Sequence, residues 1–341
     1  MTGELQLPAH VDPERVGDVW KVDYETRFAE AASWAEEHAL EPATRDVTRV
    51  CLLVVDAQNT FCTPGFELFV AGRSGTGALD DNRRLCDFVY RNLGRITQTV
   101  VTLDTHQAFQ IFHAPFLVDA DGRHPDPFTL VTPEDVATGR WRVDPGAAAT
   151  LGLSQPEAHL RTYVEALAEG GKYDLTIWPF HALLGGIGHA LVSAVEEALF
   201  FHAVARSAQT RFEIKGEHPL TEHYSVLGPE VLWGAAGEPL GTRNAALVEH
   251  LLGFDAVLVA GQAKSHCVAW TVADLLLDVP EIAPRLYLLE DCSSSVVVPG
   301  IDYTGDADAA FARFEEAGAH VVRSTEPVAS WPGPLAAAAV S

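Results

Sequence analysis

The chain has 341 residues, of which 48% are hydrophobic and 21% charged, proportions typical of a globular protein that can bury a core. It carries 23 Lys and Arg against 47 Asp and Glu, a net charge of −24. This acidity argues against nucleic acid, whose phosphates need clustered basic residues, and against an anionic membrane surface.

The termini and cysteines favour a cytoplasmic protein. The N-terminal residues lack the basic and apolar regions of a signal peptide, and no apolar run reaches about 18 residues, so we expect no membrane span. The five cysteines are widely spaced and form no Cys-x-x-Cys pair. That pattern fits a reducing compartment better than a disulfide framework.

Residues 1–47 are polar and acidic, and we interpret them as an N-terminal extension with one helix at 25–38. Beyond them, apolar runs alternate with amphipathic segments. Strands are predicted at 50–55, 99–103, 210–214, 256–260, 285–289 and 320–322, and helices at 82–93, 188–201, 242–252, 265–277 and 307–317. This alternation predicts an α/β domain at 48–325 with a doubly wound, mostly parallel sheet flanked by helices on both faces. Residues 326–341 form a C-terminal tail.

One segment interrupts the alternation. Residues 114–175 are rich in Pro, Gly, Asp and Thr, and we interpret them as a long insertion within the domain. Long loops in compact domains usually serve a purpose, so we expect a lid or an oligomer contact there.

Polar residues follow several of the predicted strands directly. Asp56, Asp104 and Lys215 each come at a strand end, and Cys267 comes just after another. Because the carboxyl ends of parallel strands meet at one edge of the sheet, where ligands bind, these side chains are expected to converge.

Cys267 is the candidate nucleophile. It lies between an apolar strand and an amphipathic helix, where the helix N-terminus is expected to lower the thiol pKa and its N–H groups could hold an oxyanion. Asp56 is a candidate general base, and Lys215 could keep the pair charged. The plain alternative is a structural cysteine, because free cysteines are among the most buried residues.

Three segments together resemble the nicotinamidase branch of the isochorismatase-like cysteine hydrolases: VVDAQNTFCTPG (54–65), KGEHPLTEHYSVL (215–227) and GQAKSHCV (261–268). The resemblance implies a three-layer sandwich and a triad of Asp56, Lys215 and Cys267. It further implies an oxyanion hole made by the amides of Ala263 and Cys267, and a cis peptide at Gln262–Ala263. The implied chemistry is attack by Cys267 on an amide, release of ammonia, and hydrolysis of the thioester.

The same resemblance implies a metal site. Asp-x-His in LDTHQAFQIFH (103–113) and W-P-x-H in IWPFH (177–181) match the family's ligand segments, although D-T-H-Q replaces its usual D-W-H-P. Asp104, His106 and His181 would bind zinc, manganese or iron, with His113 as a further candidate ligand. The alternative is that His106 and His181 are hydrogen-bonded groups of the pocket wall. No organic cofactor is expected.

Aromatic residues near these motifs are candidates for the pocket wall. Phe61 and Trp178 would stack on a flat substrate ring, although core packing is the commoner fate of an aromatic residue. The remaining histidines, among them His124, His218 and His223, are assigned to the surface.

The leading functional hypothesis is hydrolysis of nicotinamide or a related small carboxamide. A carbamoyl, ureido or specialised amide substrate is the second hypothesis, since the extension and the insertion could reshape the pocket. Isochorismatase activity, cleavage of a vinyl ether, is disfavoured by the presence of Cys267, and a non-catalytic binding role by the complete triad. Family members commonly assemble, so the resemblance also implies a homo-oligomer.

Overall fold

The computed structural model describes residues 4–335. Its centre is a six-stranded sheet in the order β12-β9-β8-β1-β2-β7, and every neighbouring pair is parallel. The strands are β1 (Val50–Val55), β2 (Gln98–Asp104), β7 (Arg211–Lys215), β8 (Ala256–Gly261), β9 (Leu286–Leu289) and β12 (His320–Val322). Strands β2 and β7 follow one another on one side of β1, and the later strands β8, β9 and β12 follow one another on its other side.

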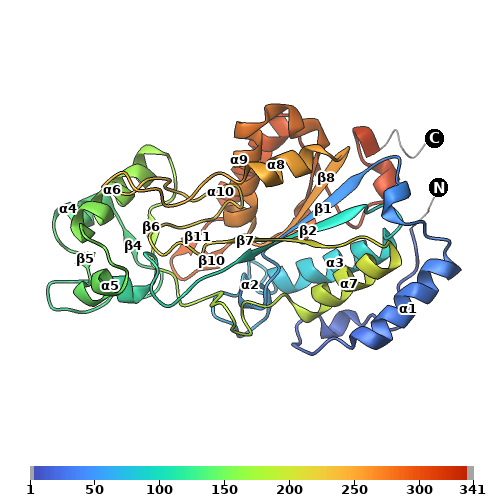
Figure 1. Ribbon diagram of the computed structural model, residues 1–341, viewed down its shortest axis with the longest axis horizontal. Helices are drawn as coiled ribbons and strands as arrows, with labels where there is room; N and C mark the ends of the chain where they lie inside the picture. Colours follow the sequence, from blue (N-terminus) through green and yellow to red (C-terminus); the bar gives the residue numbers. More distant parts are fainter. Residues whose placement is uncertain (1–3, 336–341) are drawn as a thin grey trace.

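Helices cover both faces of this sheet (Figure 1). On one face lie α3 (Gly77–Arg91) and α7 (Ser193–Ala205), with α1 (Tyr24–Glu37) packed against α7. On the other lie α8 (Ala245–Leu252), α9 (Ala269–Asp278) and α10 (Thr304–Glu316). The predicted doubly wound α/β fold is therefore confirmed.

The sequence of β1 shows why this strand is apolar at every position. Leu52 and Val54 join the core on the α3 and α7 side, whereas Leu53 and Val55 join the core beneath α8, α9 and α10. Because alternate side chains of a strand point to opposite faces, a strand covered on both faces must be apolar throughout. The two cores therefore meet through the central strands.

Most predicted elements occur, with shifted ends. The strand predicted at 320–322 has those bounds, whereas the helix predicted to begin at 188 begins at Ser193. The backbone before Ser193 is already engaged, because the carbonyls of Gly188 and Ala190 accept hydrogen bonds from the loop after β1. The short helix α2 (Asn59–Cys62) lies in that loop.

The insertion at 114–175 is folded rather than a plain loop. It contains three α-helices and four short strands, and each of these α-helices begins with a proline, which suits the first helical position. These elements are α4 (Pro133–Ala137), α5 (Pro145–Thr150), α6 (Pro156–Glu169), β3 (Leu117–Val118), β4 (Leu130–Val131), β5 (Arg142–Val143) and β6 (Leu175–Thr176). They gather at one end of the molecule, on the left in Figure 1. Near the end of the insertion, the Tyr173 hydroxyl donates to the Ser265 carbonyl (3.0 Å), two residues before Cys267.

The two terminal segments pack on the domain. Arg27 of α1 pairs with Glu197 of α7 (2.9 Å), and Trp331 in the C-terminal tail stacks on Phe88 of α3 with ring centroids 5.7 Å apart. Residues 336–341 of the predicted tail lie outside the described residues. A small hairpin, β10 (Val297–Val298) with β11 (Ile301–Asp302), precedes α10.

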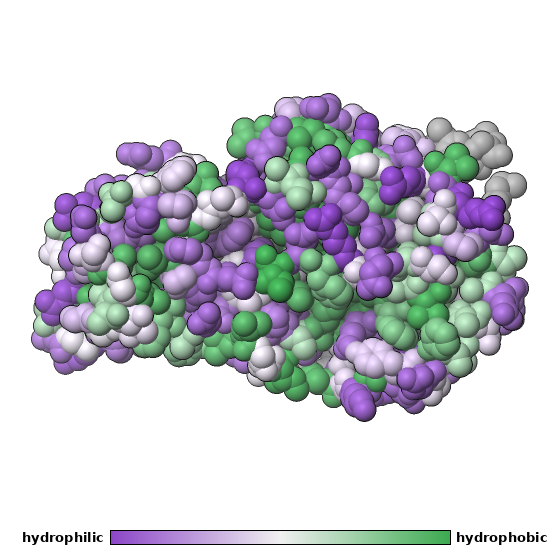
Figure 2. All heavy atoms as spheres, in the orientation of Figure 1, coloured by the Kyte–Doolittle hydropathy of each residue, from purple (hydrophilic) through white to green (hydrophobic). Residues whose placement is uncertain are grey.

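Hydrophilic and hydrophobic residues are interspersed on the face shown in Figure 2. Within residues 4–335, no helix is both long and apolar enough to cross a membrane. The five cysteines are free and buried.

The contact between β1 and β8 depends on a glycine. Gly261 pairs with Val55 in register and has a φ of +113°. A Cβ atom there would lie 2.0 Å from the Val55 carbonyl oxygen, far inside contact distance. Since Asp56 and the segment leading to Cys267 follow directly, this close approach sets the spacing of the site.

We predict that Gly261→Ala lowers the free energy of unfolding by more than about 3 kcal/mol, because a clash with a buried backbone adds to the penalty of the positive φ. Gly300→Ala is the matched control, since Gly300 also has a positive φ (+83°) but open space around it. That control is expected to lose only about 1–2 kcal/mol. Urea unfolding measures both, and equal losses would contradict the prediction.

Candidate active site and metal centre

The ammonium of Lys215 is the centre of the site. Its Nζ lies 2.9 Å from Asp56 Oδ2 and 2.9 Å from Asp104 Oδ1, donates to the His223 carbonyl (2.9 Å), and lies 3.6 Å from Cys267 Sγ. Lys215 ends β7, which pairs with β2 so that Asp104 is its direct neighbour in register. The structure thus brings together the three residues of the predicted triad.

Lys215 is buried yet charged. Burial alone would lower its pKa, but the carboxylates of Asp104 and Asp56 hold the pKa well above its usual value. The ammonium therefore persists at neutral pH beside the thiol.

Asp56 is held in a fixed orientation at the end of β1. Its φ of +45° lies in the left-handed region, which Asp tolerates better than most residues. Its N–H donates to Thr102 Oγ1 (3.0 Å), and the Thr102 hydroxyl donates to Asp56 Oδ1 (2.5 Å). Burial raises the pKa of Asp56, against the opposing effect of Lys215. A carboxylate with a raised pKa is a better proton acceptor than an exposed one.

Cys267 does not have the low thiol pKa that its position near a helix start suggested. Burial raises its pKa well above the usual value, more than the charge of Lys215 lowers it, and Asp56 and Asp104 add to the rise. Cys267 lies inside a π-helical turn (Lys264–Val268), and α9 begins only at Ala269. The prediction of a helix-stabilised thiolate was therefore wrong, and the resting thiol is protonated and needs a base.

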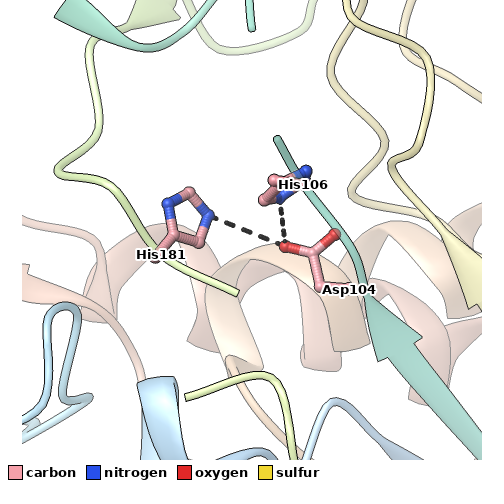
Figure 3. A group of neighbouring side chains, drawn as sticks. All are labelled: Asp104, His106 and His181. Carbon is pink, nitrogen blue, oxygen red and sulfur yellow. Dashed lines mark hydrogen bonds and ion pairs between the residues drawn. The ribbon is translucent and has the colours of Figure 1, made fainter. Parts of the chain in front are cut away.

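Asp104, His106 and His181 form a compact group of candidate metal ligands (Figure 3). The Nε2 atoms of His106 and His181 lie 2.7 Å and 3.7 Å from Asp104 Oδ2, and one potential ligand atom of each residue falls within 4.8 Å of the others. The opposite ring nitrogens face backbone carbonyls, Nδ1 of His106 at Gly216 O (3.0 Å) and Nδ1 of His181 at Pro179 O (2.8 Å).

This arrangement fits a divalent ion. Both Nδ1 atoms face carbonyl oxygens, to which a neutral ring would donate its proton, and each Nε2 would then be free to bind a cation beside the Asp104 carboxylate. Burial lowers the pKa of His181, so its imidazole is neutral, as a metal ligand must be. Two imidazoles and one carboxylate suit zinc, manganese or iron.

Gly216 makes room for this group. It follows Lys215 with a φ of +86°, and a Cβ there would lie 2.6 Å from His106 Cε1 and 2.8 Å from Asp104 Oδ1. His113, the further candidate ligand, is buried beside the group with its ring centroid 5.6 Å from that of His181, but it is not part of the ligand cluster.

Cys267 and the three candidate metal ligands line one cavity, and Lys215 lies behind that wall in contact with Asp104 and Cys267. Phe61 and Trp178 line the cavity, as do Ala263 and Cys267, whose amides are the predicted oxyanion hole. The Gln262–Ala263 peptide is cis, as the resemblance implied.

Several cavity residues were missed from the sequence: Glu222, His223, Tyr224, Gln262 and His266. His223 was assigned to the surface, and that assignment was wrong, whereas His124 is exposed and His218 half-buried. The available signal was the position of Glu222 and His223 between Lys215 and the Tyr-Ser pair. Sequence spacing alone could not show that this irregular segment folds back over the cavity.

No protein-family model matches the chain, and no curated protein matches it. Solved structures are similar to it at low sequence identity. A nicotinamidase/pyrazinamidase of Acinetobacter baumanii shares 21% identity, with a TM-score of 0.49 over 82% of this chain and 99% of that one. The pyrazinamidase of Pyrococcus horikoshii in complex with zinc shares 17%, with a TM-score of 0.43 over 81% and 99%.

An N-carbamoylsarcosine amidase of Thermoplasma acidophilum shares 16% identity, with a TM-score of 0.39 over 82% of this chain and 98% of that one.

We predict that the protein binds one divalent ion through Asp104, His106 and His181. His181→Ala is expected to weaken zinc binding at least about tenfold, because the three ligands act on one ion. His124→Ala removes an exposed histidine and is expected to bind like the parent. Isothermal titration with Zn²⁺ and elemental analysis measure this. Equal zinc affinity in both variants would rule out the assigned ligands.

Proposed function

We propose that the chain hydrolyses the amide bond of nicotinamide or a related small aromatic carboxamide, releasing ammonia through a thioester on Cys267. The observation that carries the proposal is the position of the Lys215 ammonium, in contact with Asp56, Asp104 and Cys267, of which Asp104 and Cys267 line the cavity. An acid, an amine and a thiol buried together at a ligand-binding edge serve nucleophilic catalysis.

The first half-reaction forms the thioester. Asp56 accepts the proton from Cys267 Sγ, and the thiolate attacks the carbonyl carbon of the amide. The negative charge that develops on the carbonyl oxygen is held by the amides of Ala263 and Cys267. The C–N bond then breaks, the leaving nitrogen takes the proton from Asp56, and ammonia departs.

The second half-reaction restores the enzyme. Asp56 accepts a proton from water, and the resulting hydroxide attacks the thioester carbonyl. The C–S bond breaks, the carboxylic acid leaves, and Cys267 recovers its proton from Asp56. Lys215 stays protonated throughout and stabilises whichever of the two anions is present.

The cavity wall orients the substrate. Phe61 and Trp178 suit a flat ring, and Trp178 Nε1 is fixed by donating to Glu222 Oε1 (2.9 Å). Asp104, His106 and His181 would hold a divalent ion, which when bound supplies a Lewis-acidic contact for a ring nitrogen of the substrate. This contact is what would favour pyridine-type rings over benzene-type rings.

We predict that Cys267→Ala lowers ammonia release from nicotinamide at least about 1,000-fold, as loss of a covalent nucleophile does. Cys86→Ala is the control, because Cys86 is another buried free cysteine but lies outside this cavity. It is expected to keep most of the parental rate. Release that persists in Cys267→Ala would remove Cys267 as the nucleophile.

The acid limb of the pH–rate profile follows Asp56. Its carboxylate must be ionised to accept the thiol proton, so activity falls as pH falls through its raised pKa. The Thr102 hydroxyl lowers that pKa by donating to the carboxylate, while Lys215, Asp104 and Cys267 face it in either case. We predict that Thr102→Val moves the acid limb of kcat/KM to higher pH.

Thr99→Val is the matched control, since Thr99 lies on the same strand but its hydroxyl contacts Thr210. Its acid limb is expected to coincide with that of the parent. If the acid limb of the kcat/KM profile does not move in Thr102→Val, or moves to lower pH, then ionisation of Asp56 does not determine that limb.

A further inference from the structure

Two adjacent cavity residues carry polar atoms that the proposed chemistry does not use. Glu222 and His223 both line the cavity. Glu222 Oε2 and His223 Nε2 are buried and have no hydrogen-bonding partner among the described residues. Buried polar atoms are nearly always paired, so two unpaired atoms on residues that line the same cavity as Cys267 call for a ligand.

The other polar atoms of both side chains already form hydrogen bonds. Those bonds determine whether each remaining atom can donate or accept a hydrogen bond. Glu222 Oε1 accepts from Trp178 Nε1 (2.9 Å) and from the Tyr224 hydroxyl (2.6 Å). His223 Nδ1 accepts from the Gly216 N–H (3.2 Å), so the proton of the neutral ring lies on Nε2. Nε2–H is therefore a donor.

Glu222 is also anchored through its backbone. Its N–H donates to the Tyr163 hydroxyl of α6 (2.9 Å), so part of the insertion holds it in place. Much of the surrounding cavity wall is apolar or aromatic, including Phe61, Leu68 and Val70. In such a wall, a fixed polar pair discriminates strongly between ligands that can and cannot satisfy it.

We propose that Glu222 and His223 select a carboxamide whose ring carries a hydroxyl group, which pairs with Glu222 Oε2 and His223 Nε2. This inference rests on the proposed function and names the substrate class of the same cavity. A hydroxyl accepts from the imidazole N–H and donates to the carboxylate. An unsubstituted ring leaves both protein atoms unpaired.

A hydroxyl suits Glu222 in either protonation state. Burial raises the pKa of Glu222 to about 8, so a neutral carboxyl group is present at pH 7. A neutral carboxyl donates to the hydroxyl oxygen, and an ionised one accepts from the hydroxyl hydrogen.

The test compares kcat/KM for ammonia release from nicotinamide and from each ring-hydroxylated nicotinamide. At least one hydroxylated isomer is expected to exceed nicotinamide by about tenfold or more. Glu222→Leu and His223→Phe are expected to bring this ratio close to one. Glu222→Gln is expected to keep part of the preference, since its amide can still hydrogen-bond.

Glu230→Gln is the matched control. Glu230 is a second buried carboxylate in the same loop region, but it pairs with Lys172 Nζ (2.9 Å) and does not line the cavity. The ratio in this variant is expected to match the parent even if both rates fall, and thermal melting checks that each variant is folded.

Two results would overturn the inference while leaving the proposed function in place. One is nicotinamide hydrolysis that depends on Cys267 with no hydroxylated isomer preferred. The other is a preference that Glu222→Leu and His223→Phe leave unchanged, which is the outcome of a merely structural role. Absence of Cys267-dependent release from any carboxamide would overturn the proposed function itself, and this inference with it.

Discussion

One buried ion-pair cluster holds the site together: the Lys215 ammonium between the carboxylates of Asp56 and Asp104. Each of these groups is costly to bury alone, and removing one partner from a buried pair typically costs about 3–5 kcal/mol. Together they satisfy one another, and the cluster keeps a net negative charge that only a further cation or proton can balance. The rest of the site is arranged around that charge.

Asp104 links the two halves of the site. Its Oδ1 lies at Lys215, which contacts Cys267, while its Oδ2 lies at His106 and His181. Burial alone would raise its pKa, but His106 and Lys215 hold the pKa well below its usual value, so Asp104 remains a carboxylate. The charge of an ion bound by His106 and His181 would therefore act on Lys215 through the Asp104 side chain. The candidate metal ligands and the candidate triad therefore form one electrostatic unit.

The sheet topology explains both what the sequence predicted and what it could not. Asp56, Asp104 and Lys215 end parallel strands, and a parallel sheet must bring such residues to one edge, so their convergence followed from the strand pattern. Strand β8 pairs with β1 on the side opposite β2. Cys267 follows β8 and Asp56 follows β1, so this pairing places the two residues side by side. These features depend on regular elements, whose periodicity is visible in the sequence.

The missed features depend on irregular backbone. His223 lies in the segment after β7, between Lys215 and Tyr224, and no periodicity marks the side on which such a residue lies. The thiol pKa of Cys267 was wrongly expected to be low, because the expectation considered the stabilising effect of a helix N-terminus and left out the effect of burial. Desolvation is a property of the whole fold, and here it outweighs the local backbone. Sequence motifs thus identified the candidate catalytic residues but not their environment.

That environment suits the proposed proton transfer. Burial raises the pKa of Asp56 and of Cys267 together, so transfer of the proton between them does not have to overcome a one-sided desolvation penalty. The transfer moves one negative charge from the carboxylate to sulfur without changing the net charge of the cavity. Lys215 lies 2.9 Å from the first anion and 3.6 Å from the second, so its attraction follows the charge with little rearrangement. In the proposed mechanism, a preorganised cation in contact with both anions is therefore what would allow a protonated, buried thiol to act as a nucleophile.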